Sequence, residues 1–189
     1  MNIKKNEKGF SYIDTMIGVV ILMVGVLALA AAVTSSVVRS REAEQQLVAK
    51  QLSNSALESV FSARDIRLSG EDGWSSIGNI GSNPVDGTPK GIFVIGQAPI
   101  RADAGADGII GTLDDACAGA GPCCVGGVCN NSAVLTGFRR QITITDINDP
   151  ERPSPPYAIM MRRIEVVIFY QTSTGTRQEA AATVVTNYQ

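Results

Sequence analysis

The feature that most constrains this chain is an uninterrupted apolar run near its N-terminus. Residues 15–33 contain no charged side chain, and a single carboxylate, Asp14, precedes them. About 20 apolar residues, at ~1.5 Å of rise each, cross the hydrocarbon layer of a bilayer as a helix. The run therefore predicts a transmembrane helix to about residue 33. Lys4, Lys5 and Lys8 precede it, and basic residues beside a first span hold that end in the cytoplasm.

Two ordinary explanations of such a run stay open. A cleaved secretory signal would use small residues such as Ala28, Ala30 and Ala32 as its cleavage positions. Against it, Asp14 would lie inside the apolar core, and the run exceeds the usual length of about 7–15 residues. An uncleaved anchor of an unrelated membrane protein is the second alternative.

The residues that lead into the run carry a resemblance. Lys8-Gly9-Phe10-Ser11-Tyr12-Ile13-Asp14 resembles the processing site of type IV pilins and type II secretion pseudopilins, and residues 20–28 are closest to V-type minor pilins. The resemblance covers about the first thirty residues. It implies that a prepilin peptidase cleaves after Gly9 on the cytoplasmic face and that Phe10 becomes the N-methylated terminus. Residues 1–9 are then a leader, and the apolar helix stays in the mature protein.

Asp14 needs a physical reason to lie so close to a membrane span. A carboxylate costs about 2.5–3.5 kcal/mol at the centre of a bilayer and less near its surface, so such groups usually have a partner. The resemblance implies an assembly role, in which Asp14 pairs with the terminal amine of a neighbouring subunit. The family usually has glutamate there, which is one methylene longer. The alternative is a capping box, in which Ser11 and Asp14 satisfy amides at the start of a helix.

The sequence after the span predicts one continuous helix over residues 10–65. Residues 34–64 contain no Pro or Gly, and their apolar positions approximate a 3.6-residue stripe: Val38, Val48, Ala49, Leu52, Ala56 and Val60. After Asp65 the composition changes to Gly, Ser, Asn and Pro, which form turns. We interpret residues 66–136 as a Gly/Ser/Cys-rich variable region.

The C-terminal part predicts an antiparallel sheet over residues 137–189. Residues 141–145, 163–170 and 180–186 are rich in β-branched and alternating apolar residues, and residues 171–176 predict a hairpin loop. Residues 92–95 predict a short buried strand, and whether it joins this sheet stays open. The predicted fold class is α+β, with the long N-terminal helix packed on a small antiparallel sheet, as in a pilin.

Residues 103–114 follow the spacing of a calcium-binding loop. Asp103, Asp107 and Asp114 occupy positions one, five and twelve, Gly108 occupies position six, and the carbonyl of Ile109 stands at position seven. Position three is glycine, position twelve is not glutamate, and no helices flank the loop. The spacing predicts structural calcium, and the alternative is a solvated acidic turn.

Four cysteines follow that loop: Cys117, Cys123, Cys124 and Cys129. An even number of cysteines in an exported segment predicts two disulfides, for which three connectivities exist. A bridge between adjacent Cys123 and Cys124 would strain the backbone, so we expect each to pair outward, with the partners left open. A Cys₄ zinc site is the alternative, but its ligands usually come as spaced pairs.

Charge and residue content exclude several functional classes. The chain has a net charge of −2, and the leader carries +2, so the mature chain carries −4 and we expect no nucleic-acid partner. The pairs Arg139-Arg140 and Arg162-Arg163 form either a local basic patch or a solvated strand edge. The chain has no histidine, which excludes Ser-His and Cys-His dyads. We expect no enzyme activity and no required cofactor.

The residues and the resemblance together predict a minor pilin or pilin-like subunit of a type IV pilus. The expected partners are prepilin peptidase, other pilins, the inner-membrane assembly platform and, before assembly, membrane lipid. The expected location is the inner membrane, as a single-pass protein with a cytoplasmic N-terminus, and then a periplasmic or extracellular filament. The alternatives are a minor pseudopilin of a type II secretion system and a membrane-anchored binding module that does not polymerise.

Overall fold

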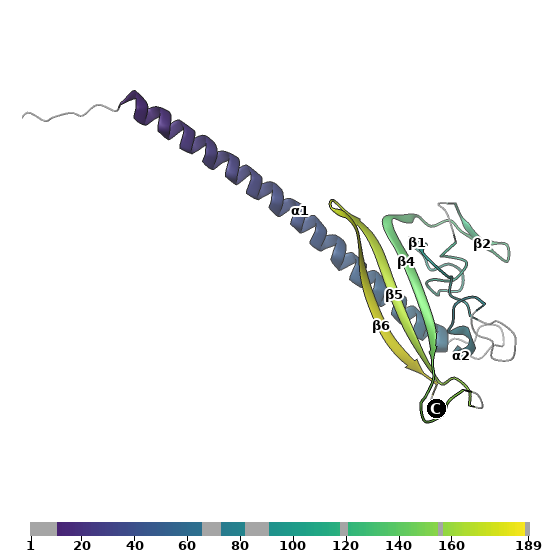
Figure 1. The fold of residues 1–189 in the computed structure, drawn as a ribbon. Helices are drawn as coiled ribbons and strands as arrows, with labels where there is room; N and C mark the ends of the chain where they lie inside the picture. The colour runs from purple at the N-terminus through teal and green to yellow at the C-terminus, as the bar shows by residue number, and fades with distance from the viewer. Residues whose placement is uncertain (1–10, 66–72, 82–90, 118–120, 155–156, 188–189) are drawn as a thin grey trace, which may run out of the picture. The chain divides into compact units, whose positions relative to one another are not determined.

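The computed structural model describes residues 11–65, 73–81, 91–117, 121–154 and 157–187. Its chain separates into two compact units, Met1–Ala43 and Glu44–Gln189, and each is described by itself. Two helices and six strands make up the described part (Figure 1): α1 (Tyr12–Asp65), α2 (Gly73–Ser76), β1 (Ala98–Arg101), β2 (Cys123–Val125), β3 (Val128–Asn130), β4 (Val134–Ile147), β5 (Met161–Thr172) and β6 (Gly175–Thr186). The predicted α+β fold class, with a long N-terminal helix and a small antiparallel sheet, is confirmed.

The first unit contains the apolar part of α1. Its large apolar side chains are exposed, among them Ile17, Leu22 and Leu29 at 54%, 68% and 69%. Apolar side chains all round a helix need burial in lipid or against other helices.

The second unit places the C-terminal part of α1 against the sheet. Its buried positions are small or short: Ala49, Ser53, Ala56, Ser59, Val60 and Ala63. Their spacing of three and four residues puts them on one face of the helix. The apolar members of this face belong to the same buried core as the sheet residues, and the larger Leu52, Leu57 and Phe61 pack at the border of this core. One residue of the predicted stripe, Val38, belongs to the first unit and is 37% exposed.

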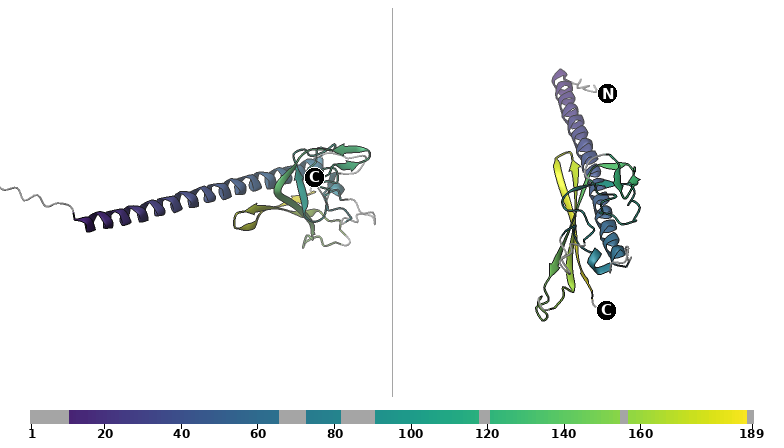
Figure 2. Two further views of the ribbon diagram at one scale, coloured as in Figure 1. Left: turned by 90° about the horizontal axis from the view of Figure 1, so that it is seen from above. Right: turned by 90° about the vertical axis from the view of Figure 1, so that its right-hand side faces the viewer.

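The main sheet has the strand order β1-β4-β5-β6, and each neighbouring pair is antiparallel. The alternating side chains Ile164, Val166, Ile168 and Tyr170 of β5 are buried in the same core as the small face of α1. The right view of Figure 2 shows β4, β5 and β6 as neighbouring strands beside the C-terminal part of α1. Thr172 pairs with Gly175, so the β5–β6 turn consists of residues 173 and 174, within the predicted loop.

The predicted strand at residues 92–95 is wrong, because these residues form no strand. The strand before β4 in the sheet is β1, at Ala98–Arg101. Phe93 is fully buried and makes only an isolated parallel bridge to Asn79. Its amide donates to the Gly78 carbonyl at 3.0 Å, and the Val94 amide donates to the Gly111 carbonyl at 2.9 Å. A short apolar run buried among loops has the same composition as a buried strand, so the pattern alone could not separate them.

Asn79 forms hydrogen bonds with the edge of β4 at residues that β1 does not pair with. Its side-chain amide donates to the Ile142 carbonyl at 2.8 Å, and its side-chain oxygen accepts from the Ile144 amide at 2.9 Å. Asn79 is 8% exposed. Its amide group therefore gives two buried backbone groups the hydrogen bonds that another strand would supply.

Candidate functional site

Asp14 lies in the first turn of α1 and is exposed. The backbone amide of Ser11 donates to Asp14 Oδ2 at 3.3 Å, and the amide of Asp14 donates to the Ser11 carbonyl at 2.9 Å. The first contact is the half of a capping box that the acidic side chain contributes. The Asp14 carboxylate is thus held beside the backbone amide of Ser11, the first described residue. Gly9 and Phe10, the predicted cleavage and methylation residues, lie outside the described residues.

The helix α1 is long and apolar enough to cross a membrane. It is the single helix in the described ranges with this property. Length and composition are thus consistent with a single-pass anchor near the N-terminus, in agreement with the predicted transmembrane segment.

The predicted calcium loop is folded around Asp114, a residue that is 8% exposed. Asp114 Oδ2 accepts from the amides of Ala106 and Asp107 at 2.7 and 3.2 Å, and Asp114 Oδ1 accepts from Thr112 Oγ1 at 2.5 Å. The backbone wraps closely enough that a Cβ on Gly105, which has φ of 83°, would lie 2.3 Å from Asp114 Oδ2. This carboxylate therefore organises the loop by accepting hydrogen bonds from it.

The other predicted calcium ligands are also engaged within the loop. Asp103 Oδ1 accepts from the Gly105 amide at 3.2 Å, Asp107 Oδ1 accepts from the Ile109 amide at 2.8 Å, and the Ile109 carbonyl accepts from Thr112 Oγ1 at 3.3 Å. Over the described ranges, no three acidic or cysteine side chains gather closely enough to hold a metal ion. The loop as folded does not fit the ligand set of a calcium site. Calcium binding stays a prediction, and no step of the proposed function depends on it.

Partial burial also changes the acid–base behaviour of this loop. Burial raises the pKa of Asp107 above its ordinary value, and the hydrogen bond from the Ile109 amide opposes that rise. Asp107 therefore takes up a proton at a higher pH in the folded chain than in the unfolded chain.

An ion pair that the sequence did not predict lies next to this loop. Asp115 Oδ2 accepts from Arg140 Nη2 at 2.8 Å, and the two side chains are 2% and 4% exposed. Asp115 Oδ1 accepts from the Gly111 amide at 2.7 Å. Burial raises the pKa of Asp115, although the Arg140 charge opposes this, and burial lowers the pKa of Arg140. Asp115 therefore connects the loop, through the Gly111 amide, to Arg140 of β4.

The four cysteines form two disulfides, Cys117–Cys123 and Cys124–Cys129. The prediction that adjacent Cys123 and Cys124 pair outward is confirmed, and the structure selects one of the connectivities left open. Cys124 and Cys129 are opposite each other in the β2–β3 hairpin, so their bridge crosses the two strands. The bridges close loops with sequence separations of 6 and 5 residues, and each is local.

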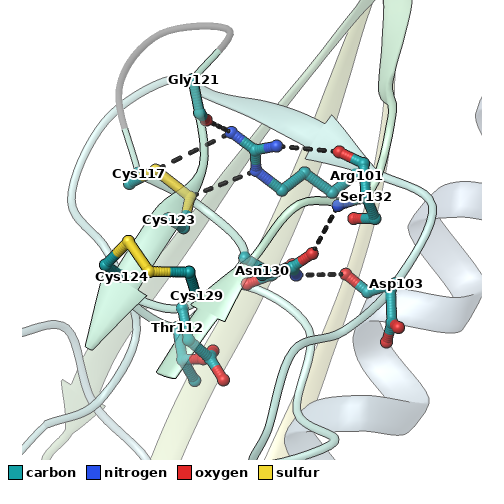
Figure 3. Close-up of a disulfide and its surroundings, with 12 residues drawn as sticks. Arg101, Asp103, Thr112, Cys117, Gly121, Cys123, Cys124, Cys129, Asn130 and Ser132 are labelled. Carbon is teal, nitrogen blue, oxygen red and sulfur yellow. Dashed lines mark hydrogen bonds between the residues drawn. A yellow bond between two sulfur atoms is a disulfide. The ribbon is translucent and has the colours of Figure 1, made fainter. Parts of the chain in front are cut away.

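Arg101 joins the first disulfide to the sheet. Its guanidinium donates to the Ser132 carbonyl at 2.9 Å and to the Gly121 carbonyl, and its Nε lies 3.1 Å from Cys123 Sγ. Arg101 is 7% exposed. Figure 3 shows the guanidinium between the Cys117–Cys123 bridge and the backbone at Ser132.

The two predicted roles of the arginine pairs, a basic patch or a solvated strand edge, both require exposed side chains, and only one arginine of each pair is exposed. Arg139 and Arg163 are exposed, whereas Arg140 and Arg162 are buried. Arg162 donates to Asp146 Oδ1 at 2.9 Å and to the Ile77 carbonyl at 2.7 Å, and its guanidinium lies 4.4 Å from the centre of the Trp74 ring. One arginine of each pair therefore belongs to the core.

A sequence signal for these two buried arginines did exist. Arg140 shares the alternation of Ile142 and Ile144, and Arg162 shares that of Ile164. Residues two apart in a strand face the same side of a sheet, so this alternation puts both arginines on the side that faces the core.

Comparisons with protein-family models, characterised proteins and solved structures gave no match to this chain.

Proposed function

We propose that this chain is a minor pilin or pilin-like structural subunit of a type IV pilus. In this proposal, prepilin peptidase cleaves after Gly9, Phe10 becomes the N-methylated terminus, and α1 assembles the subunit into a filament. The observation that carries the proposal is a combination of three sequence features. The Lys8-Gly9-Phe10 motif is followed by one carboxylate, Asp14, and then by the apolar residues 15–33, which carry no charge.

The energetics of the apolar helix segment support assembly. Before assembly, lipid covers its side chains. In a filament, helices of neighbouring pilins would cover the same side chains, since a helix that is apolar all round needs burial on every side. The small exposed residues of this segment, Gly18, Gly25 and Ala32, would also allow close helix contacts.

Asp14 would change partners when the leader is removed. In the uncleaved chain it accepts from the Ser11 amide at 3.3 Å, a contact of modest strength. Cleavage would create a cationic amine at Phe10, and a charged donor forms a stronger bond with a carboxylate than a neutral amide does. In the proposed assembly step, the amine is that of a neighbouring subunit, and the pairing sets the register between helices.

Determination of the mature N-terminus by mass spectrometry tests the processing step. The proposal predicts a chain that begins with N-methylated Phe10. A mature chain that retains Met1 would support a non-polymerising anchor, and a chain that begins after Ala30 would support a secreted domain. Either result would overturn the proposal.

A second experiment tests assembly separately from processing. The variant Asp14→Ala should be cleaved normally but should be absent from filaments sheared from the cell surface. The matched control is Asp103→Asn, which changes an exposed carboxylate of the C-terminal unit and should assemble. If the wild-type chain is absent from surface filaments while its deletion stops protein secretion, the pseudopilin alternative replaces the pilus.

A further inference from the structure

The two disulfides of this chain have different surroundings. Cys123 is 1% exposed, whereas its partner Cys117 is partly exposed. Arg101 Nε lies 3.1 Å from Cys123 Sγ, and Arg101 Nη2 lies 3.9 Å from Cys117 Sγ. The second bridge joins two exposed residues, Cys124 and Cys129, and no guanidinium contact to it is found within the described part of the chain.

A guanidinium at this distance favours one redox form of the buried sulfur. A neutral disulfide sulfur is a weak acceptor, so it gains little from Arg101. A thiolate in the same place would gain a charge-assisted contact in a site where water screens the charge poorly. Cationic side chains stabilise thiolates in this manner at reactive cysteines.

The guanidinium has one contact that lies outside the loop closed by this disulfide. It donates to the carbonyl of Ser132, at the start of the segment that leads into β4, and Arg101 itself belongs to β1. The amide of Ala102 donates to the Ala133 carbonyl at 3.0 Å, so the two segments are also joined by their backbones. Opening the bridge would therefore leave the cation beside Cys123.

We propose that Cys117 and Cys123 form a thiol–disulfide exchange site, in which Arg101 holds Cys123 as a thiolate and Cys117 is the sulfur that an external dithiol–disulfide oxidoreductase contacts. The Cys124–Cys129 bridge is a structural link of the β2–β3 hairpin. This assignment does not depend on assembly into a filament, but it requires the C-terminal unit to be in a compartment that contains such an enzyme.

The exchange can be written in two steps during bridge formation. First, the Cys117 thiolate attacks the disulfide of the oxidoreductase, which forms a mixed disulfide at Cys117 and releases one enzyme thiolate. Second, the Cys123 thiolate attacks Cys117 Sγ, so the Cys117–Cys123 bond forms and the bond to the enzyme breaks. The two cysteines lose two electrons, which the enzyme disulfide gains, and the protons lost by the cysteine thiols balance those that protonate the enzyme thiolates.

Reduction follows the same path in reverse. A thiolate of the enzyme attacks Cys117, the more exposed of the two cysteines, and Cys123 is the leaving group. A leaving thiol with a lower pKa departs faster. Arg101 therefore accelerates opening of this bridge as well as its closure, and it acts as a positioning residue for Cys123.

The test uses the full chain in detergent micelles with the second bridge removed by Cys124→Ser and Cys129→Ser. The remaining bridge is reduced with a phosphine, and thiolate absorbance is followed from about pH 5 to about pH 10, around the ordinary thiol value of ~8.5. We expect one thiol to ionise about one pH unit or more below that value. Adding Arg101→Gln should remove this shift, Arg101→Lys should retain most of it, and Arg139→Gln, at an exposed arginine of β4, should leave it unchanged.

Emission from Trp74, the single tryptophan, reports whether Arg101→Gln folds. A second measurement tests the proposal even if this variant does not fold. The otherwise unmodified chain is incubated in glutathione buffers, acid-quenched and mapped by tandem mass spectrometry. The expected mixed disulfide is on Cys117, with Cys123 free. Glutathione mainly on Cys123, two thiols that both ionise near ~8.5, or a folded Arg101→Gln variant that keeps the low midpoint would each overturn the proposal.

Discussion

Arg140 Nη2 donates to Asp115 Oδ2 at 2.8 Å in a site where both side chains are at most 4% exposed. A buried ion pair contributes little net stability compared with apolar residues of the same volume, but removal of one partner leaves an uncompensated charge in the core. The contact between β4 and Asp115, the residue that follows the 103–114 loop, therefore depends on both members of the pair.

The first prediction concerns this pair. Asp115→Ala should lower the free energy of unfolding by about 3–5 kcal/mol, because Arg140 then lies buried without its carboxylate. Urea denaturation of the full chain in detergent, followed by Trp74 emission, measures the change. The control Glu165→Ala breaks the exposed Arg163–Glu165 pair, at 3.6 Å, and should cost about 1 kcal/mol or less. If Asp115→Leu with Arg140→Met is as unstable as Asp115→Ala, the explanation by an uncompensated charge is wrong.

The second prediction is a pH dependence. The pKa of Asp107 is raised in the folded chain, mainly by burial, from a reference value of 3.8. Its stabilising contribution is therefore full below that value and is lost as the pH rises through the folded-state pKa. Asp107→Asn keeps the acceptor for the Ile109 amide but cannot ionise, so the variant should be at least as stable as wild type at neutral pH. Denaturation at several pH values should show this advantage shrinking toward pH 3.8; an advantage that grows on acidification would contradict the direction of the shift.

The third prediction separates hydrogen bonding from calcium in the loop. Asp114→Ala leaves the amides of Ala106 and Asp107 without their acceptor, which should cost about 1–3 kcal/mol per buried group left unsatisfied. The Thr112 hydroxyl loses the same acceptor but keeps the Ile109 carbonyl at 3.3 Å. The loss should be the same in calcium and in chelator. Thermal unfolding of wild type, Asp114→Ala and the exposed control Asp103→Asn measures it. A wild-type melting temperature that rises with calcium, and ceases to do so in both variants, would instead establish the calcium site.

The fourth prediction tests the side chain that completes β4. Asn79→Ala removes the acceptor of the Ile144 amide and the donor to the Ile142 carbonyl, and should destabilise the fold by about 1–3 kcal/mol. Hydrogen exchange should quicken at the Ile144 amide more than at amides in the β5–β6 pairing. The exposed control Asn131→Ala should leave the Ile144 amide protected. Equal protection of this amide in Asn79→Ala would show that the side-chain contact is not what protects it.

The elements with a strong period were predictable from the sequence. The helix ends at Asp65, where Gly and Ser become frequent, and β5 shows the alternation of Ile164, Val166 and Ile168. The outward pairing of Cys123 and Cys124 followed from the cost of bridging neighbours. These features depend on residues close in the sequence, whose geometry local chemistry determines.

The rest depended on contacts between distant residues. Phe93 is buried by loops that meet only in the folded chain, so its apolar surroundings in the sequence suggested a strand. Asp115 and Arg140 are 25 residues apart, and Arg101 lies 22 residues before Cys123. No local pattern specifies such partners. The spacing of Asp103, Asp107 and Asp114 matched a calcium loop, but spacing does not determine whether carboxylate oxygens face a cation or the amides of the loop.

The local character of the two disulfides has a mechanical consequence. Both bridges lie between Cys117 and Cys129, so they enclose only a short piece of the C-terminal unit. If tension were applied between α1 and the C-terminus, the disulfides would prevent extension only of the residues inside their two short loops. Resistance to pulling would then come from backbone pairing, and above all from the unbroken register between β5 and β6, which runs from Met161 opposite Thr186 to Thr172 opposite Gly175.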